Sequence, residues 1–274
     1  ELPTILADGS FEGDVSATFE QRITMGENPI ISFAAQPTDS DDPIVEVELG
    51  TTATTQYVYN ASIIFDEAVN FTHADSAGTD FTMFGQKYSV STSTTTTKLI
   101  LFRSSKTVFL DSLSNPSETV TIDGKEYTAE LISATDTSAE IKITNSDGVS
   151  EQKEITEDTS KKVNGIEVSV DSADESTALN KITASVIVGS SKLTLQDGVQ
   201  VKQGSDDDLI DGTTVFFKDG SDVTTTYPGG IGKLIFQVAA GDNTKDSIPS
   251  GGELVDPIFG TFKVSFAGLN IERD

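Results

Sequence analysis

The residues best suited to chemistry in this sequence are aspartates gathered in two short clusters. They are Asp39, Asp41 and Asp42 in the first cluster, and Asp206, Asp207, Asp208 and Asp211 in the second. Calcium prefers six to eight oxygen ligands on a chain that curls around it, so adjacent aspartates in loops predict a site for a divalent ion, with Ca²⁺ the expected ion. Neither cluster matches an EF-hand loop, which needs Gly at its sixth position and Glu at its twelfth. A solvated acidic turn that keeps the surface soluble is the alternative interpretation of each cluster.

Side-chain combinations for catalysis are scarce. The chain has no Cys, which excludes a thiol nucleophile and a thiolate metal site, and its one histidine, His73, has no second His for a zinc site or an acid–base relay. We therefore expect His73, in a polar run, to be a solvated loop residue. The glycine-rich run 229–233 is followed by Leu234, where a phosphate-binding Walker loop needs Ser or Thr. The sequence predicts no enzyme activity and no organic cofactor, and a hydrolase stays an alternative only because any fold can carry a grafted site.

The charge balance excludes other classes of function. The 274-residue chain has 44 acidic and 18 basic residues, a net charge of −26. Binding to nucleic acid depends on neutralising phosphates with Lys and Arg, and anionic membrane surfaces also attract basic proteins, so neither partner is expected. No run of 18 apolar residues is present, so no direct membrane span is predicted. A polyanion instead attracts cations, and salt screens its self-repulsion.

Two features point to export. The chain begins at Glu1 without an apolar signal segment, which indicates a processed, extracellular protein, although a shortened chain would begin in the same way. Sequons for N-glycosylation occur at Asn60 and Asn70, although two in a chain of this length are close to the number expected by chance.

The elements that must carry these residues are β-strands. Apolar and polar residues alternate with a period of two, and no segment has a helical period. The clearest runs are 14–19, 44–49, 57–65, 98–102, 107–110, 139–143, 182–188, 215–217, 233–238 and 262–266. We predict an all-β fold with multiple Ig-like or other β-sandwich domains.

Glycine-containing turns recur between these runs, at Gly85, Asp123-Gly124 and Asn164-Gly165. Such dipeptides favour tight hairpin turns, because both central residues need positive φ. The pattern indicates either the ordinary hairpins of an all-β protein or an internal structural repeat.

Domain boundaries follow from two polar breaks, at 115–118 and 171–176. The runs that flank the intervening segment resemble each other, Lys-Leu-Ile-Leu at 98–101 and Lys-Leu-Thr-Leu at 192–195. We predict an N-terminal β domain at 1–115, a small inserted β domain at 116–189 and a C-terminal segment at 190–274 that completes the first domain. A linear string of three domains is the alternative.

Several phrases together resemble archaeal surface-layer (S-layer) proteins. They are the opening LPTILADGSF at 2–11, the hairpins IDGKEYT at 122–128 and VNGIEV at 163–168, the strand SKLTLQDG at 191–198 and the closing DPIFGTFKVSFAG at 256–268. The resemblance implies a secreted, acidic, Thr-rich protein of β-sandwich domains that assembles and does not catalyse, with glycans and metal ions in many members. Members are often longer and carry a membrane anchor or stalk, which this sequence lacks. The chain is then a piece of a longer protein or a relative that polymerises into a filament.

We therefore expect a secreted structural subunit whose partners are other copies of itself, in a cell-surface layer or an extracellular filament. Calcium ions at the two aspartate clusters would offset repulsion between copies, and edge strands would pair between them. The alternative is a cell-surface adhesin or carbohydrate-binding β-sandwich module, which shares the architecture and the acidic loops.

Overall fold

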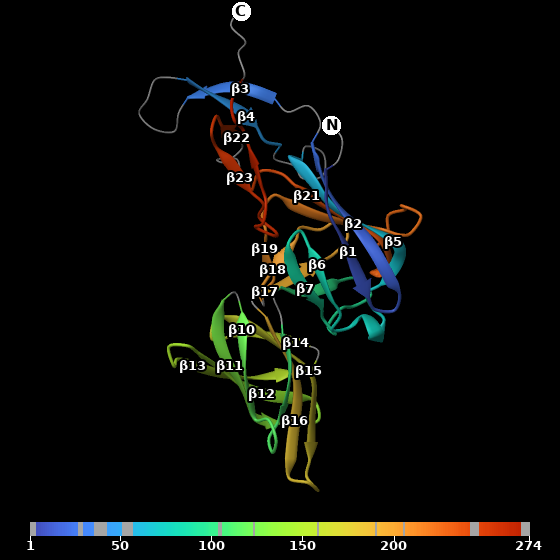
Figure 1. The fold of residues 1–274 in the computed structure, drawn as a ribbon, viewed down its shortest axis with the longest axis vertical. Coiled ribbons are helices and arrows are strands. Elements are labelled where there is room, and N and C mark those ends of the chain that lie inside the picture. Colours follow the sequence, from blue (N-terminus) through green and yellow to red (C-terminus); the bar gives the residue numbers. More distant parts are fainter. Residues whose placement is uncertain are drawn as a thin grey trace, which may run out of the picture.

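The computed structural model describes residues 4–26, 30–35, 43–50, 57–103, 106–122, 124–157, 159–189, 191–204, 206–241 and 247–269. Within these ranges the chain forms 24 strands and one short 3₁₀ helix, η1 (Ala74–Ser76), and no α-helix. The strands form several separate antiparallel sheets, which confirms the predicted all-β, multi-domain sandwich class (Figure 1).

The larger part of the molecule is built from two main sheets. The first has the order β1 (Thr4–Glu12), β2 (Ser16–Met25), β5 (Tyr59–Asn70), β21 (Gly229–Val238) and β20 (Thr213–Lys218). The second has the order β19 (Asp208–Leu209), β18 (Lys202–Gln203), β17 (Ser191–Leu195), β8 (Leu99–Arg103), β7 (Gln86–Val90) and β6 (Asp80–Met83). Two small sheets add β22 (Ser247–Pro249), β4 (Pro43–Glu48) and β3 (Ile30–Ala35), and the pair β23 (Glu253–Val255) and β24 (Lys263–Ser265).

The remaining strands form two four-stranded sheets between residues 106 and 189. One has the order β10 (Ser117–Ile122), β11 (Lys125–Ala134), β12 (Ser138–Asn145) and β13 (Ser150–Thr156). The other has the order β14 (Thr159–Val163), β15 (Ile166–Ser176), β16 (Lys181–Gly189) and β9 (Lys106–Asp111). We call this part the 106–189 unit and the rest the larger unit.

Buried hydrophobic side chains form two clusters, one in each unit. In the larger unit, alternate residues of β5 point inward, so Tyr59, Ala61 and Ile63 are fully buried while the intervening Asn60 is only partly buried. The second cluster draws only on residues 108–188. It includes Val108 and Leu110 of β9, which the predicted boundary at residue 116 assigned to the N-terminal domain.

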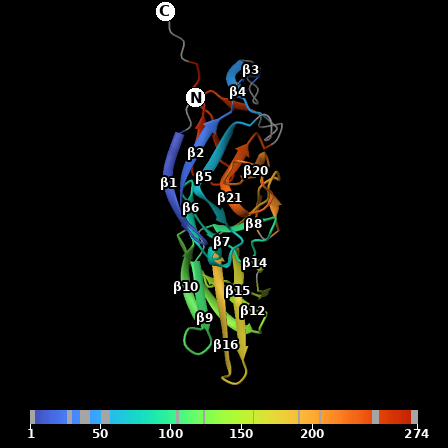
Figure 2. The ribbon, with the colours of Figure 1, turned by 90° about the vertical axis from the view of Figure 1, so that its right-hand side faces the viewer.

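Two strand pairs join the units. β8 pairs with β17 in the larger unit, and the next strands along the chain, β9 and β16, pair with each other in the 106–189 unit. The chain therefore leaves and re-enters the larger unit through neighbouring strands. Figures 1 and 2 show the two units arranged along one long axis, with β3 and β4 at the end opposite the β15–β16 hairpin.

The recurring glycine turns are hairpins. Phe84-Gly85 and Asn164-Gly165 have positive φ at both residues and join β6 to β7 and β14 to β15. Gly124, with φ of +76°, lies in the turn between β10 and β11. Ordinary hairpin turns account for these phrases, and an internal repeat stays a prediction.

Candidate functional site

The second aspartate cluster lies where β18 and β19 meet, and its central member is already paired. Asp207 forms an ion pair with Lys192 at 3.0 Å and accepts a hydrogen bond of 3.1 Å from the Thr194 hydroxyl. Partial burial opposes ionisation of Asp207, but the contacts with Lys192 and Thr194 and the charge of Lys202 outweigh it and lower its pKa. Lysines on neighbouring strands thus offset the charge of Asp207, one of the four aspartates that the sequence suggested for calcium.

The other members of this cluster point to different neighbours. Asp208 is exposed in β19, and Asp211 accepts a hydrogen bond of 3.4 Å from Gln200. In the part of the chain that the structure describes, no three His, Cys, Asp or Glu side chains are grouped so that they could hold a metal ion. The structure therefore does not bring Asp206, Asp207, Asp208 and Asp211 together as a ligand set, and calcium binding there stays a prediction. Asp39, Asp41 and Asp42 lie outside the described residues.

The two sequons have different surroundings. Asn70 ends β5, and its side-chain oxygen accepts hydrogen bonds from the backbone N–H of Thr72 at 3.0 Å and from the Thr72 hydroxyl at 2.7 Å. Asn60 lies inside β5, where it is paired with Thr24 of β2 on one side and Gln237 of β21 on the other. Because glycosylated asparagines lie in surface loops, this difference favours Asn70 over Asn60 as an acceptor. Glycosylation of either residue stays a prediction.

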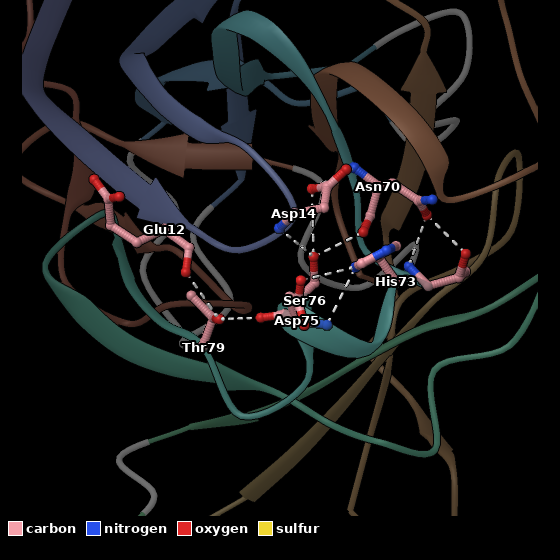
Figure 3. A network of polar contacts seen from close by, with 8 residues as sticks. Glu12, Asp14, Asn70, His73, Asp75, Ser76 and Thr79 are labelled. Carbon is pink, nitrogen blue, oxygen red and sulfur yellow. Dashed lines mark hydrogen bonds and ion pairs between the residues drawn. The ribbon is translucent and has the colours of Figure 1, made fainter.

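A polar network surrounds His73 (Figure 3). His73 Nδ1 accepts a hydrogen bond of 3.2 Å from the backbone N–H of Asp75 and so caps η1. The buried Ser76 hydroxyl donates to the backbone oxygen of Asn70 at 2.8 Å and accepts from the backbone N–H of Asp14 at 3.3 Å. The Ser76 hydroxyl also lies 3.4 Å from the Asp14 carboxylate, so the network anchors the β1–β2 turn to the end of β5.

A buried carboxylate that sequence reasoning missed lies in the core of the larger unit. Asp256 is 2% exposed and accepts hydrogen bonds from the Tyr59 hydroxyl and from the backbone N–H groups of Phe259 and Gly260. Burial raises the pKa of Asp256, and burial together with the Asp256 charge raises the pKa of Tyr59. Asp256 begins a Pro-containing turn at 256–260, which was the only local signal of its role. These contacts attach the C-terminal segment to β5.

A cavity of about 420 Å³ lies between the two units. The larger unit contributes His73 and Thr92, and the 106–189 unit contributes Thr107, Asp171 and Ile187. Within the described residues, the Thr92 hydroxyl oxygen is buried without a hydrogen-bond partner. The cavity therefore offers polar groups that a small polar molecule or water could contact.

Edge strands and exposed apolar side chains occur in both units. In the described chain β3 pairs only with β4 and so has one unpaired edge. β9 is also an edge strand, but Asn115 covers part of its outer edge, by a bridge to Asp111 and a hydrogen bond of 3.0 Å to the backbone oxygen of Phe109. Apolar side chains are exposed on both strands: Ile30 and Ile31 are 59% and 48% exposed on β3, and Phe109 is 58% exposed on β9. Leu113 and Leu179, 67% and 68% exposed, lie at the end of the 106–189 unit. Such edges and apolar side chains are suited to contact with another chain.

Among the described residues, no helix is long and apolar enough to cross a membrane. Comparisons with protein-family models, with curated proteins and with solved structures find no match for this chain.

Proposed function

We propose that this protein is a secreted structural subunit, without enzyme activity, that assembles with copies of itself into a cell-surface layer or an extracellular filament. The observation that carries the proposal is the open edge of β3, with Ile30 and Ile31 exposed on it, at one end of an elongated all-β molecule whose other end exposes Leu113 and Leu179. An edge strand presents unpaired N–H and C=O groups, and pairing them with an edge of a second copy forms a continuous sheet. The resemblance to archaeal S-layer proteins supports the same function.

The proposed organisation is a larger sandwich unit with the 106–189 unit inserted into it. The two buried clusters and the paired connecting strands support this division. Since β8 pairs with β17 in one unit and β9 pairs with β16 in the other, force applied to one unit passes to the other through these paired strands.

Assembly must overcome the net charge of −26 per copy. Cations reduce this repulsion, either by screening or by binding between carboxylates of neighbouring copies. A divalent ion that takes ligands from the Asp206–Asp211 loop of one copy and from a second copy would be compatible with the dispersed carboxylates of that loop. We propose Ca²⁺ as this ion.

Negative-stain electron microscopy and light scattering on the purified protein test the proposal. The samples are the protein alone, with calcium in the millimolar range, and with excess chelator at low salt. Ordered sheets or fibres that need calcium would support both the assembly and the ion. Polymers that form equally well with chelator would contradict the calcium proposal, and monomers under every condition would contradict the assembly.

The cavity between the two units favours a second candidate, an adhesin or carbohydrate-binding module. Its threonine hydroxyls, His73 and Asp171 are polar groups that could orient a sugar. Glycan-array binding by a monomeric protein, lost in Asp171→Ala, would favour this candidate over the structural subunit.

A further inference from the structure

A second open cleft, of about 470 Å³, is bordered by three lysines, Lys153, Lys161 and Lys162. Lys153 belongs to β13, and the other two belong to β14, the next strand along the chain. The border also includes Asp206 of the larger unit. Only 18 of the residues in this chain are basic, so three around one cleft are a local concentration of positive charge.

The positions of two of these ammonium groups are set by backbone carbonyls. Lys153 Nζ donates to the backbone oxygen of Lys162 at 2.7 Å and pairs with Glu151 at 3.0 Å. Lys161 Nζ donates to the backbone oxygen of Glu154 at 2.6 Å. An ammonium group has three N–H donors, so Lys161 keeps donor capacity for another acceptor. Within the described residues, Lys162 Nζ has no hydrogen bond or ion pair.

The two carboxylates at the cleft do not cancel its charge. Glu151 is occupied by Lys153 and by the backbone N–H of Asn164, at 2.6 Å. Asp206 borders the cleft, but in the part of the chain that the structure describes it forms no ion pair with the three lysines. Three lysines and two carboxylates therefore border the cleft, an excess of one positive charge on a molecule whose net charge is −26.

Such a cleft suits an acidic peptide segment, and this chain carries one. The Asp39–Asp42 segment has three aspartates in four residues and no basic residue. It belongs to residues 36–42, which connect β3 to β4, and those strands pair up to Ala35 and Pro43. The other acidic cluster is less suited, because Asp206 is already part of the cleft border and Asp207 is paired with Lys192.

We propose that the cleft bordered by Lys153, Lys161 and Lys162 binds the Asp39–Asp42 segment of a second copy of this chain. The inference rests on the proposed self-assembly and specifies one of its contacts. The cleft and the segment are different surfaces, so the contact is heterologous, and its repetition produces a filament or a ring. Complementary charge selects this pairing from the many repulsive ones between two acidic molecules.

A peptide of residues 36–45 tests the contact without requiring assembly. A fluorescently labelled peptide is titrated with the full chain at low ionic strength, and binding is followed by fluorescence anisotropy. We expect binding that weakens as NaCl is added, because salt screens exposed charges. A peptide with Asn at positions 39, 41 and 42 is the control and should not bind.

The protein variant for this titration reverses two cleft charges, by Lys161→Glu with Lys162→Glu. We expect its affinity for the peptide to be at least about tenfold lower than that of the wild type. The matched control, Lys125→Glu with Lys218→Glu, makes the same change in net charge away from the cleft and should bind the peptide nearly as well as the wild type. Circular dichroism shows whether each variant is folded.

Mixing two charge-reversed proteins provides a test that does not depend on loss of binding. The first protein is the variant with Lys161→Glu and Lys162→Glu, and the second carries Asp41→Lys with Asp42→Lys. In each variant alone, the cleft and the Asp39–Asp42 segment carry charges of the same sign. In an equal mixture, the acidic cleft of the first variant meets the basic segment of the second, and the basic cleft of the second meets the acidic segment of the first. We expect polymers from the mixture and none from either variant alone.

The outcomes separate this inference from the proposed function. Peptide binding that is equal for the wild type and the cleft-reversed variant, or absent from both, would overturn the cleft assignment even if the wild type polymerises. Peptide binding that depends on the lysines would support the cleft assignment, and if the wild type then stays monomeric in every condition, the proposed assembly fails instead.

Discussion

Replacing Tyr59 by Phe removes a single hydroxyl group from the core of the larger unit. Tyr59 is fully buried, and its hydroxyl donates a hydrogen bond to Asp256, which is 2% exposed. The change in volume is small, so the main effect is the loss of this hydrogen bond. A hydrogen bond to a charged group contributes about 1.5–3 kcal/mol, and Asp256 would keep only its two backbone donors. We expect the free energy of unfolding to fall by about 2 kcal/mol.

Tyr88→Phe is a matched control in the same core. Tyr88 is 1% exposed, and within the described residues its hydroxyl oxygen has no hydrogen-bond partner. Removing a buried hydroxyl without a partner relieves a desolvation cost, so we expect no loss of stability and even a small gain. The two substitutions delete the same atom from equally buried tyrosines and differ only in the partner.

Guanidinium denaturation followed by circular dichroism measures both effects, with the m-value as a check that the same surface unfolds. For a chain of this size, 2 kcal/mol corresponds to a decrease in Tm of about 4–8 °C. Equal losses in Tyr59→Phe and Tyr88→Phe, or a larger loss in Tyr88→Phe, would refute the assignment of the Tyr59–Asp256 contact as a stabilising bond.

Three further predictions concern titration and modification. Burial raises the pKa of Asp256 above the ordinary Asp value of about 3.9, so the folded state binds this proton more tightly and stability falls as pH rises from about 4 to the raised pKa. In denaturation measured across pH, the wild type should lose stability relative to Asp256→Asn in that window, and a pH-independent difference would contradict the prediction. Asp111 behaves in the opposite way, because the hydrogen bonds that it accepts from Lys181, Leu113 and Ser114 lower its pKa to about 2. The stability lost in Asp111→Asn should be largest above pH 4 and should shrink as pH falls toward 2, which the same measurement checks. If the protein is glycosylated during secretion from its native host, Thr72→Ala should abolish a glycan at Asn70 in mass spectrometry, while Ser62→Ala should change nothing; a glycan at Asn60 alone would refute the distinction between the sequons.

Much of the local structure could be predicted from the sequence, because local structure depends on neighbouring residues. The alternation at 57–65 identifies Tyr59, Ala61 and Ile63 as one face of a strand, since successive side chains of a strand point to opposite faces. Asn164-Gly165 predicts a tight hairpin, since few residues adopt positive φ at low cost. The absence of a helical period correctly excluded α-helices from the described chain.

The pairing partners of these strands could not be predicted, because the alternation of apolar and polar residues shows which face of a strand is buried but not which strand lies beside it. β5 pairs with β21, whose residues come about 170 positions later, and β9 pairs with β16 across the whole 106–189 unit. Such pairings depend on which apolar faces pack together once the chain collapses, a property of the entire core.

The candidate sites show the same division. Composition and clustering alone identified the acidic character of the chain and the two aspartate clusters. Only the tertiary structure placed Lys192 beside Asp207, the Tyr59 hydroxyl on Asp256, and the lysines of β13 and β14 around one cleft with Asp206. A carboxylate's role depends on the charges and donors within a few ångströms of it, and those come from residues far away in the sequence, which only the packing of strands brings close.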